Sequence, residues 1–290
     1  LIASTGVIGA ELPMGIIQNG IEAITLNNSG HDFAKAIMTT DTHSKEFAVE
    51  IEIDGIKGTI AGAAKGVGMI HPDMATMLSF ITTDFAIDPD FLKSALKETA
   101  DQTFNMVSVD GDTSTNDTLI ILANGLAANT PIEDGTNGKQ FSEALFEVCK
   151  ALAKMIARDG EGATKFISVH VRGGKHEKDC LQVAYAVAES PLVKTAMFAG
   201  DPNWGRILAA IGRAGIDDMR IDEVSIAISG YCIVAGGSCV RDYEESKAAT
   251  LMKRDEIDIS IEIGLGSAAV SVWTCDFSYD YVKINAEYRS

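Results

Sequence analysis

A threonine that follows an alanine, inside a segment rich in glycine and methionine, is the position in this chain best suited to covalent chemistry. Residues 65–78 read KGVGMIHPDMATML and place Ala75 and Thr76 after two glycines and a proline. Glycines let one stretch of backbone approach another closely, so the Thr76 hydroxyl could attack the carbonyl group before it. Hydrolysis of the resulting ester would leave an N-terminal threonine whose α-amine serves as general base for its own hydroxyl. From composition alone, a packed methionine-rich turn is favoured over self-cleavage.

Groups that such a nucleophile would need occur in other segments. Thr5 and Gly6 lie in a small polar turn whose N–H groups and hydroxyl could stabilise an oxyanion, although a plain glycine turn is the simpler explanation. Lys65 could hold a substrate carboxylate or tune the α-amine. Glu161 stands between two glycines after a predicted helix and could bind an ammonium group, although a solvated helix end is the default interpretation.

Residues 108–118 superficially resemble a calcium-binding loop, because Asp110, Asp112 and Ser114 alternate along it. The twelfth position of that loop would be Ile121, which cannot ligate calcium, and the glycine stands second instead of sixth. A hydrogen-bonded structural loop is therefore favoured, and no metal site is predicted.

Two more polar residues remain as candidates. Arg206 follows a glycine-bounded turn and could bind a carboxylate bidentately, but a structural turn with Arg206 in a local ion pair is favoured. No two histidines have the spacing of metal ligands, and His71 is the histidine that lies near Thr76 in the sequence.

The composition argues against two classes of partner. The 290 residues include 24 Lys and Arg against 41 Asp and Glu, which gives a net charge of -17. Such a charge repels phosphate backbones and anionic lipids, so we expect neither nucleic-acid nor membrane binding. Five cysteines without a CxxC pair indicate a reducing compartment, which we take to be the cytoplasm. No apolar run approaches the ~20 residues that span a bilayer.

Hydrophobic patterns predict a mixture of strands and helices. Strands are expected at 47–53, 59–61, 166–171, 224–229, 257–263 and 268–275, the last two forming a hairpin through 264–266. Helices are expected from Asp88 and Pro89 to about 99, at 140–158, at 177–199 with an interruption at Pro191, and at 241–254. This mixture favours an α+β or layered sandwich over a regular βαβ repeat, with a boundary near 160–166.

Taken together, these segments resemble the ornithine acetyltransferase family, also called the bifunctional glutamate N-acetyltransferases of arginine biosynthesis. The element Lys-Gly-x-Gly-Met-Ile…Met-Ala-Thr-Met-Leu is highly specific for that family, and it makes cleavage between Ala75 and Thr76 the favoured interpretation. The resemblance covers the whole chain in the family's order, through residues 3–9, 39–42, 65–78, 110–118, 159–164, 200–212 and 279–290.

The resemblance implies a mechanism and a set of site residues. Thr76 would be the nucleophile and the first residue of a β chain, 76–290, with an α chain that ends at Ala75. Acetyl would move from N2-acetyl-L-ornithine to L-glutamate in a ping-pong reaction through acetyl-Thr76, without a metal or other cofactor, and acetyl-CoA is an alternative donor in some members. Thr5 and Gly6 would form the oxyanion hole. The implied substrate contacts are Thr39, Lys65, Thr76, Glu161, Asn285 and Ser290.

The resemblance also implies an architecture. The fold would be an α/β (α+β) layered αββα-type sandwich similar to the N-terminal nucleophile hydrolases but of distinct topology. Residues 1–165 would form the main domain, and 166–290 would form a smaller C-terminal α/β domain whose tail returns to the active site. The α and β chains would assemble into an α2β2 heterotetramer.

Three departures from the family pattern bear on these expectations. The family has a substantial segment upstream of Leu1, and a chain without it is expected to lack sheet strands. His71 and Asp73 stand where the family more often has a small residue and an asparagine, which could alter the rate of cleavage. Ser290 replaces a common threonine and keeps the hydroxyl.

Two other functions fit the same residues. An N-terminal-nucleophile amidohydrolase or aminopeptidase would pass the acyl group to water instead of glutamate. A non-catalytic amino-acid-binding protein would use Lys65, Arg206 and Glu161 as a clamp for a zwitterion, but it would not need Ala75 and Thr76 in such a loop.

Overall fold

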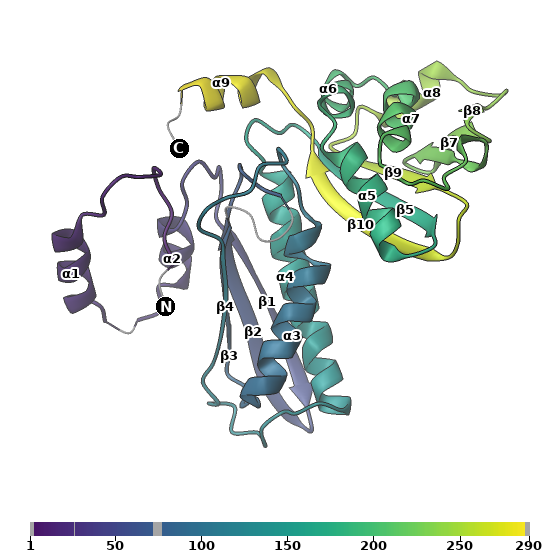
Figure 1. Cartoon of the computed structure of the whole chain (residues 1–290). Coiled ribbons are helices and arrows are strands. Elements are labelled where there is room, and N and C mark those ends of the chain that lie inside the picture. Colours follow the sequence, from purple (N-terminus) through teal and green to yellow (C-terminus); the bar gives the residue numbers. More distant parts are fainter. Residues whose placement is uncertain (1–2, 26, 72–76, 288–290) are drawn as a thin grey trace.

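The computed structural model describes residues 3–25, 27–71 and 77–287, and it is a mixed α/β structure built on two mixed sheets (Figure 1). The first sheet has the strand order β1-β2-β3-β4, and the second has the order β10-β5-β9-β6-β7-β8. The long helix α4 (Thr136–Arg158) packs along the first sheet and leads into the second (Figure 1). Among the described residues, no helix combines the length and apolar character needed to cross a bilayer.

The elements that precede β5 build the first sheet and its helices. They are α1 (Met14–Glu22), α2 (Gly30–Ala36), β1 (Lys45–Ile53), β2 (Ile56–Lys65), β3 (Leu78–Thr83), α3 (Pro89–Gln102), a 3-10 turn (Phe104–Met106), β4 (Thr118–Ala123) and α4. The remaining elements build the second sheet and its helices. They are β5 (Phe166–Gly174), α5 (Glu177–Ala188), α6 (Pro191–Ala199), α7 (Trp204–Gly212), a 3-10 turn (Ile221–Glu223), β6 (Ser225–Ile228), β7 (Tyr231–Ala235), β8 (Ser238–Cys239), α8 (Glu245–Leu251), β9 (Glu256–Glu262), β10 (Ala268–Cys275) and α9 (Tyr279–Glu287).

The hairpin of β1 and β2 confirms the predicted strand at 47–53. Asp54 and Gly55 have φ values of 51° and 77°, which the tight turn between two antiparallel strands requires. The second strand is longer than the predicted 59–61, because it pairs with β1 from Ile56 to Ala64 and with β3 as far as Lys65. This length matters for function, since it extends β2 to Lys65.

The two long helices on the first sheet begin for identifiable reasons. Asp88 accepts hydrogen bonds from the backbone N–H groups of Asp90 at 3.0 Å and Phe91 at 2.9 Å, and Pro89 occupies the first turn, as predicted. Helix α4 starts at Thr136, four residues before the predicted start, and buries one apolar stripe against β1 and β2.

One predicted pairing is wrong: β9 and β10 do not form a hairpin. Strand β5 lies between them, parallel to β9 and antiparallel to β10. The connection crosses the end of β5, where the N–H groups of Leu265 and Gly266 donate to the Gly173 carbonyl at 2.6 and 2.7 Å. A Cβ at Gly266 would lie 2.5 Å from the Gly174 oxygen, so this crossing requires glycine. Alternation predicted both strands but could not identify their neighbour.

The helix predictions in the second half are partly confirmed. The predicted interruption at Pro191 is real, because α5 ends at Ala188 and Ser190 caps α6 by accepting from the Val193 N–H at 3.4 Å. The helix predicted at 241–254 is shorter, since only Glu245–Leu251 is helical. Its start is set by Tyr231 of β7, whose hydroxyl accepts the Glu244 N–H at 2.9 Å.

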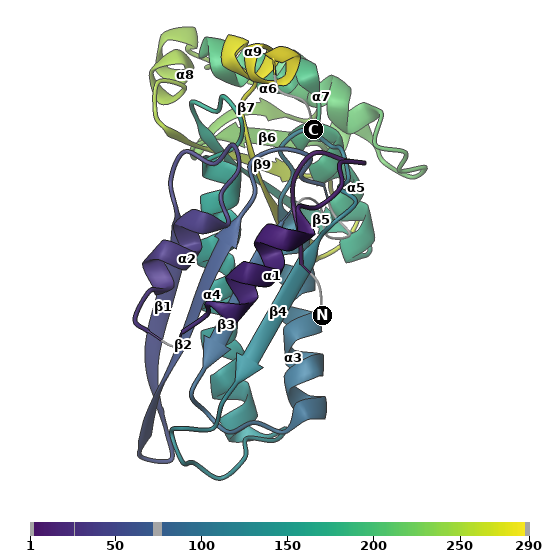
Figure 2. The same cartoon turned by 90° about the vertical axis from the view of Figure 1, so that its left-hand side faces the viewer.

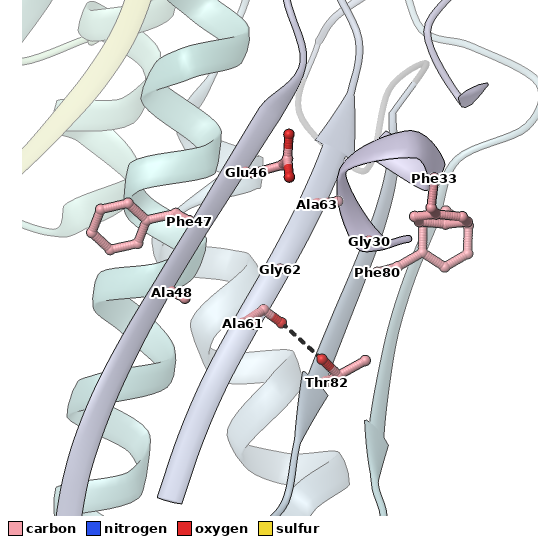
Figure 3. A pocket seen from close by; sticks show the side chains of 10 residues that line it. All are labelled: Gly30, Phe33, Glu46, Phe47, Ala48, Ala61, Gly62, Ala63, Phe80 and Thr82. Atoms are coloured by element: carbon pink, nitrogen blue, oxygen red, sulfur yellow. Dashed lines mark hydrogen bonds between the residues drawn. The ribbon is translucent and has the colours of Figure 1, made fainter. Parts of the chain in front are cut away.

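The two faces of the first sheet are covered unequally (Figure 2). Helices α3 and α4 cover one face, whereas α2 covers part of the other, where Phe33 packs edge-on against Phe80 at 5.1 Å. Beside this contact lies a mostly apolar pocket of about 380 Å³, whose lining includes Ala61, Ala63 and Thr82 (Figure 3). Helix α1 buries none of its residues and lies beyond α2 (Figure 1). The second face of this sheet is therefore only partly covered.

Candidate active site

A small pocket of about 80 Å³ gathers residues from distant parts of the chain. The N-terminal segment, the loop before β1, the end of β2, the turn after α4 and helix α9 all contribute to it. Its lining residues are Thr5, Gly6, Thr39, Thr40, Lys65, Val67, Gly68, Met69, Glu161 and Asn285. Six of these are oxyanion-hole or substrate contacts implied by the family resemblance, and they are all of those contacts that the structure describes. Ala75, Thr76 and Ser290 lie outside the described residues.

Glu161 is held in the pocket by hydrogen bonds from two sides. Its Oε1 accepts the Thr40 hydroxyl at 2.8 Å, and its Oε2 accepts the Asn285 amide at 2.8 Å. The residue is only 9% exposed, and its N–H donates to the Val67 carbonyl at 2.8 Å. The interpretation of Glu161 as a solvated helix end is therefore wrong. A fixed, buried carboxylate at a pocket wall is suited to binding an ammonium group.

The C-terminal helix α9 reaches this pocket because the turn after α4 lets it approach closely. Gly162 has a φ of 67°, and a Cβ there would lie 2.3 Å from the Tyr281 nitrogen. Ser278 donates to the Gly162 carbonyl at 2.5 Å, which fixes the start of α9. Asn285 is thereby placed next to Glu161, although 124 residues separate them in the sequence.

Lys65 is the last residue of β2 and is 2% exposed. Burial lowers its pKa, and the Lys45 ammonium lowers it further, while Asp41, Glu161 and Asp117 act in the opposite direction. Among the described residues, no side chain forms a hydrogen bond or ion pair with its ammonium, which faces the pocket. A partly desolvated cation that faces a pocket is suited to binding a carboxylate.

A buried ionic cluster holds three walls of the pocket together. Lys45 has no exposed surface, and its ammonium contacts Asp41 at 2.7 Å and Asp159 at 2.6 Å. Asp41 also accepts the N–H groups of Thr39 at 3.1 Å and Gly66 at 2.9 Å. Burial alone would raise the pKa of Asp41, but Lys45 and these N–H groups outweigh it, so the pKa lies below its ordinary value.

This cluster was not predicted, although its signals are present in the sequence. Asp41 and Asp159 belong to the segments that resemble the family, but only Thr39 and Glu161 were chosen from them. Lys45 is placed on the α4-facing side of β1 by the same alternation that buries Ile53. A lysine at such a position indicates a buried ion pair.

The loop at residues 108–118 is a hydrogen-bonded loop, as favoured from its sequence. The Asp110 carboxylate accepts the N–H groups of Met69 at 2.8 Å and Ile70 at 3.1 Å, and burial raises its pKa. At the other end of the loop, Asp117 accepts the Met77 N–H at 2.8 Å. Burial raises the pKa of Asp117 to about 7, while the Met77 N–H and the Lys65 charge act against this rise.

The remaining two candidates do not line the pocket. The His71 Nδ1 lies 2.5 Å from Oε1 of Glu189, at the end of α5, and the same carboxylate oxygen accepts the Ser108 hydroxyl at 2.9 Å. Arg206 donates to the Leu192 carbonyl oxygen at 2.8 Å. The Thr195 hydroxyl donates to the same oxygen at 3.3 Å, and no ion pair of Arg206 is found among the described residues, so the predicted local ion pair is not observed there.

Comparison with known proteins places the chain in a family. The ArgJ family model matches residues 1–290. The arginine biosynthesis bifunctional protein ArgJ of Dehalococcoides mccartyi (strain CBDB1) is 50% identical over 292 residues, which cover 100% of this chain and 72% of that protein. The protein of the same name from Pseudomonas fluorescens (strain Pf0-1) is 45% identical over 292 residues, which cover 99% of this chain and 72% of that protein.

A solved structure agrees with this match. The crystal structure of the arginine biosynthesis bifunctional protein ArgJ from Bacillus halodurans aligns with a TM-score of 0.69 and 41% identity, over 72% of this chain and 98% of that chain. The identity, the coverage and the matching fold lead to one conclusion: the chain belongs to the ArgJ family.

Proposed function

We infer that this chain is a bifunctional acetyltransferase of arginine biosynthesis, acting as an ornithine acetyltransferase and as a glutamate N-acetyltransferase. Membership of the ArgJ family supports this activity. The observation that carries the assignment of the site is the pocket in which Thr5, Gly6, Lys65, Glu161 and Asn285 meet. Its charged groups match the two charges of an amino-acid substrate.

We propose that Thr76 is the nucleophile, freed by self-cleavage between Ala75 and Thr76. The Thr76 oxygen attacks the acetyl carbon of N2-acetyl-L-ornithine while the α-amine takes the hydroxyl proton. The tetrahedral oxyanion is stabilised at Thr5 and Gly6, and ornithine leaves with the proton returned to its nitrogen. The neutral amine of glutamate then attacks the acetyl-Thr76 ester, and the α-amine of Thr76 passes the proton lost by that nitrogen to the departing threonine oxygen. A ping-pong reaction through acetyl-Thr76 results.

The same proposal gives the pocket residues their roles. The Lys65 ammonium binds the substrate carboxylate, and the Glu161 carboxylate binds the ammonium group of ornithine. Thr39, Asn285 and Ser290 complete the substrate contacts. The buried position of Lys65 and the fixed position of Glu161 support these roles, because charges that are partly desolvated and held in place bind opposite charges more strongly.

The finer architecture is part of this proposal. An αββα-type sandwich would cover the second face of the first sheet, which presents Ala61, Phe80 and the exposed Leu122. Residues 1–165 would then be the main domain and 166–290 the smaller one, with α9 as the returning tail. An α2β2 heterotetramer in the cytoplasm completes the proposal, and the five free cysteines fit a reducing compartment.

Mass spectrometry of the purified full-length protein tests the function. We expect two fragments that meet at Ala75 and Thr76, and an added acetyl group on the Thr76 peptide after incubation with N-acetylornithine. Thr76→Ala should remain uncut and lose essentially all transfer, because it lacks the nucleophile. Full activity in Thr76→Ala would contradict the mechanism. Acetyl release that is independent of glutamate would instead indicate an amidohydrolase.

A further inference from the structure

Two carboxylates of one loop hold the chain on either side of residues 72–76. Asp110 accepts the N–H groups of Met69 and Ile70, which come before this segment. Asp117 accepts the N–H of Met77, which comes directly after it, at 2.8 Å. Thr76 lies outside the described residues, but its carbonyl carbon is bonded to the Met77 nitrogen that Asp117 holds.

The sheet register explains why Asp117 reaches Met77. Lys65 pairs with Leu78 across β2 and β3, and Leu78 pairs with Thr118 across β3 and β4. The end of β2 and the starts of β3 and β4 therefore lie side by side. The Thr118 N–H also donates to the Met77 carbonyl at 2.9 Å. Met77 is thus fixed through both of its backbone polar groups by two consecutive residues.

We propose that Asp117 is a positioning residue for the Thr76 nucleophile: its carboxylate anchors the peptide that follows Thr76 and places a negative charge near the Lys65 ammonium. This role rests on the proposed function of Thr76. In this proposal the loop at 108–118 contributes to the reaction as well as to the stability of the fold. Because a peptide group is planar, holding the Met77 N–H restricts the orientation of the bond that leads back to Thr76.

The charge of Asp117 makes the strength of its hydrogen bond with the Met77 N–H depend on pH. Its half-buried carboxyl group has a pKa of about 7, raised by burial and opposed by the Met77 N–H and the Lys65 charge. The charged groups that act on Lys65 in turn are Asp41, Lys45 and Glu161. Asp117 therefore gains its charge as the pH rises through 7. Above that pH the anchor is a charge-assisted hydrogen bond and Lys65 is stabilised as a cation.

Asp117→Asn tests the charge separately from the shape. The asparagine oxygen can still accept the Met77 N–H, but it carries no charge at any pH. We expect kcat for acetyl transfer at pH 8 to fall about tenfold, because charge-assisted hydrogen bonds are about twice as strong as neutral ones. We also expect the acid limb of the wild-type kcat/KM profile near pH 7 to disappear, leaving the limb of the Thr76 α-amine. The exposed Asp112→Asn, in the same loop, is the matched control and should behave as wild type.

The measurements are the fraction of cleaved chain, kcat and KM with N-acetylornithine and glutamate, and circular dichroism as a test of folding. An Asp117→Asn profile that overlays the wild-type profile would overturn the proposal, and so would a lower kcat with an unchanged acid limb, because that result is purely structural. A wild-type chain that neither cleaves nor transfers acetyl would overturn the proposed function and, with it, the role of Asp117.

Asp117→Glu provides the test if Asp117→Asn does not fold. Glutamate keeps the charge but displaces it by one methylene group, so we expect the acid limb to remain while kcat falls. An Asp117→Glu variant without an acid limb, or with the wild-type kcat, would contradict the proposal.

Discussion

The space beside Gly68 is occupied by the carboxyl group of Glu161. A Cβ at position 68 would lie 2.7 Å from both the carboxyl carbon and Oε2 of Glu161, which is closer than real contacts allow. Gly68 is not in the left-handed region, so its backbone would accept alanine, and the contact with Glu161 is what requires glycine. At the residue scale, the absence of a Cβ at position 68 leaves the space that the Glu161 carboxylate occupies.

Gly68→Ala is therefore expected to displace Glu161 and to weaken its hydrogen bonds with Thr40 and Asn285. We expect the KM for N-acetylornithine to rise about tenfold, which corresponds to about 1.4 kcal/mol, with self-cleavage largely retained. Steady-state kinetics of the cleaved protein measures the change. Gly212→Ala in α7, where a Cβ meets no atom within 4 Å, is the control. An unchanged KM in Gly68→Ala would show that the position of Glu161 does not matter for ornithine binding.

At the scale of elements, the cluster of Asp41, Lys45 and Asp159 connects the start of β1 to the loop before it and to the end of α4. The loop before β1 carries Thr39 and Thr40 of the pocket, and the turn after α4 carries Glu161. The cluster contributes little net stability by itself, because burying charges costs about as much as their attraction returns. Its consequence is geometric: the pocket walls keep a fixed spacing.

Lys45→Met tests this cluster, because it removes the cation and leaves two carboxylates buried. We expect the free energy of unfolding at pH 7, from urea denaturation, to fall by about 3–5 kcal/mol. Asp41 has a lowered pKa in the folded protein, so in wild type its stabilising contribution is present above pH 4 and lost as the pH falls further. The difference in unfolding free energy between wild type and Lys45→Met should become smaller toward pH 4, because protonation removes the repulsion between the two buried carboxylates.

The control for Lys45→Met is Lys57→Met. Lys57 and Glu50 form an ion pair of 3.8 Å in which both side chains are about 70% exposed. Such a pair contributes at most about 1 kcal/mol, so its loss should have little effect. A Lys45→Met deficit no larger than that of Lys57→Met would contradict the assignment of the buried cluster.

At the scale of the whole molecule, the two sheets are not independent bodies. Phe166, Trp273 and Cys275 come from strands of the second sheet but belong to the hydrophobic core of the first. Helix α9 then returns from the second sheet to the pocket at the end of the first (Figure 1). The candidate site therefore depends on the docking of both halves.

How much of the fold and of the candidate site could be predicted depends on how far apart in the sequence the interacting residues lie. Local patterns predicted β10 and the start of α3, because alternation and capping act within a few residues. The prediction of a β9–β10 hairpin was wrong because β5, which is distant in the sequence, pairs with both strands and lies between them. The family resemblance predicted the residues around Glu161, whereas Asp117 and Lys45 gain their roles from sheet register and burial, which the sequence does not show directly.

The pairing of β2 with β3 determines what a cut between Ala75 and Thr76 would do to the molecule. The two strands form an antiparallel ladder from Ile60 opposite Thr83 to Lys65 opposite Leu78. The cut would assign β2 to one polypeptide and β3 to the other, yet the ladder and the shared core would keep the pieces together. Folding of the mature protein from separated pieces would then be a second-order reaction. Its stability would depend on concentration, although the same chain folds once, before the cut, as a single molecule.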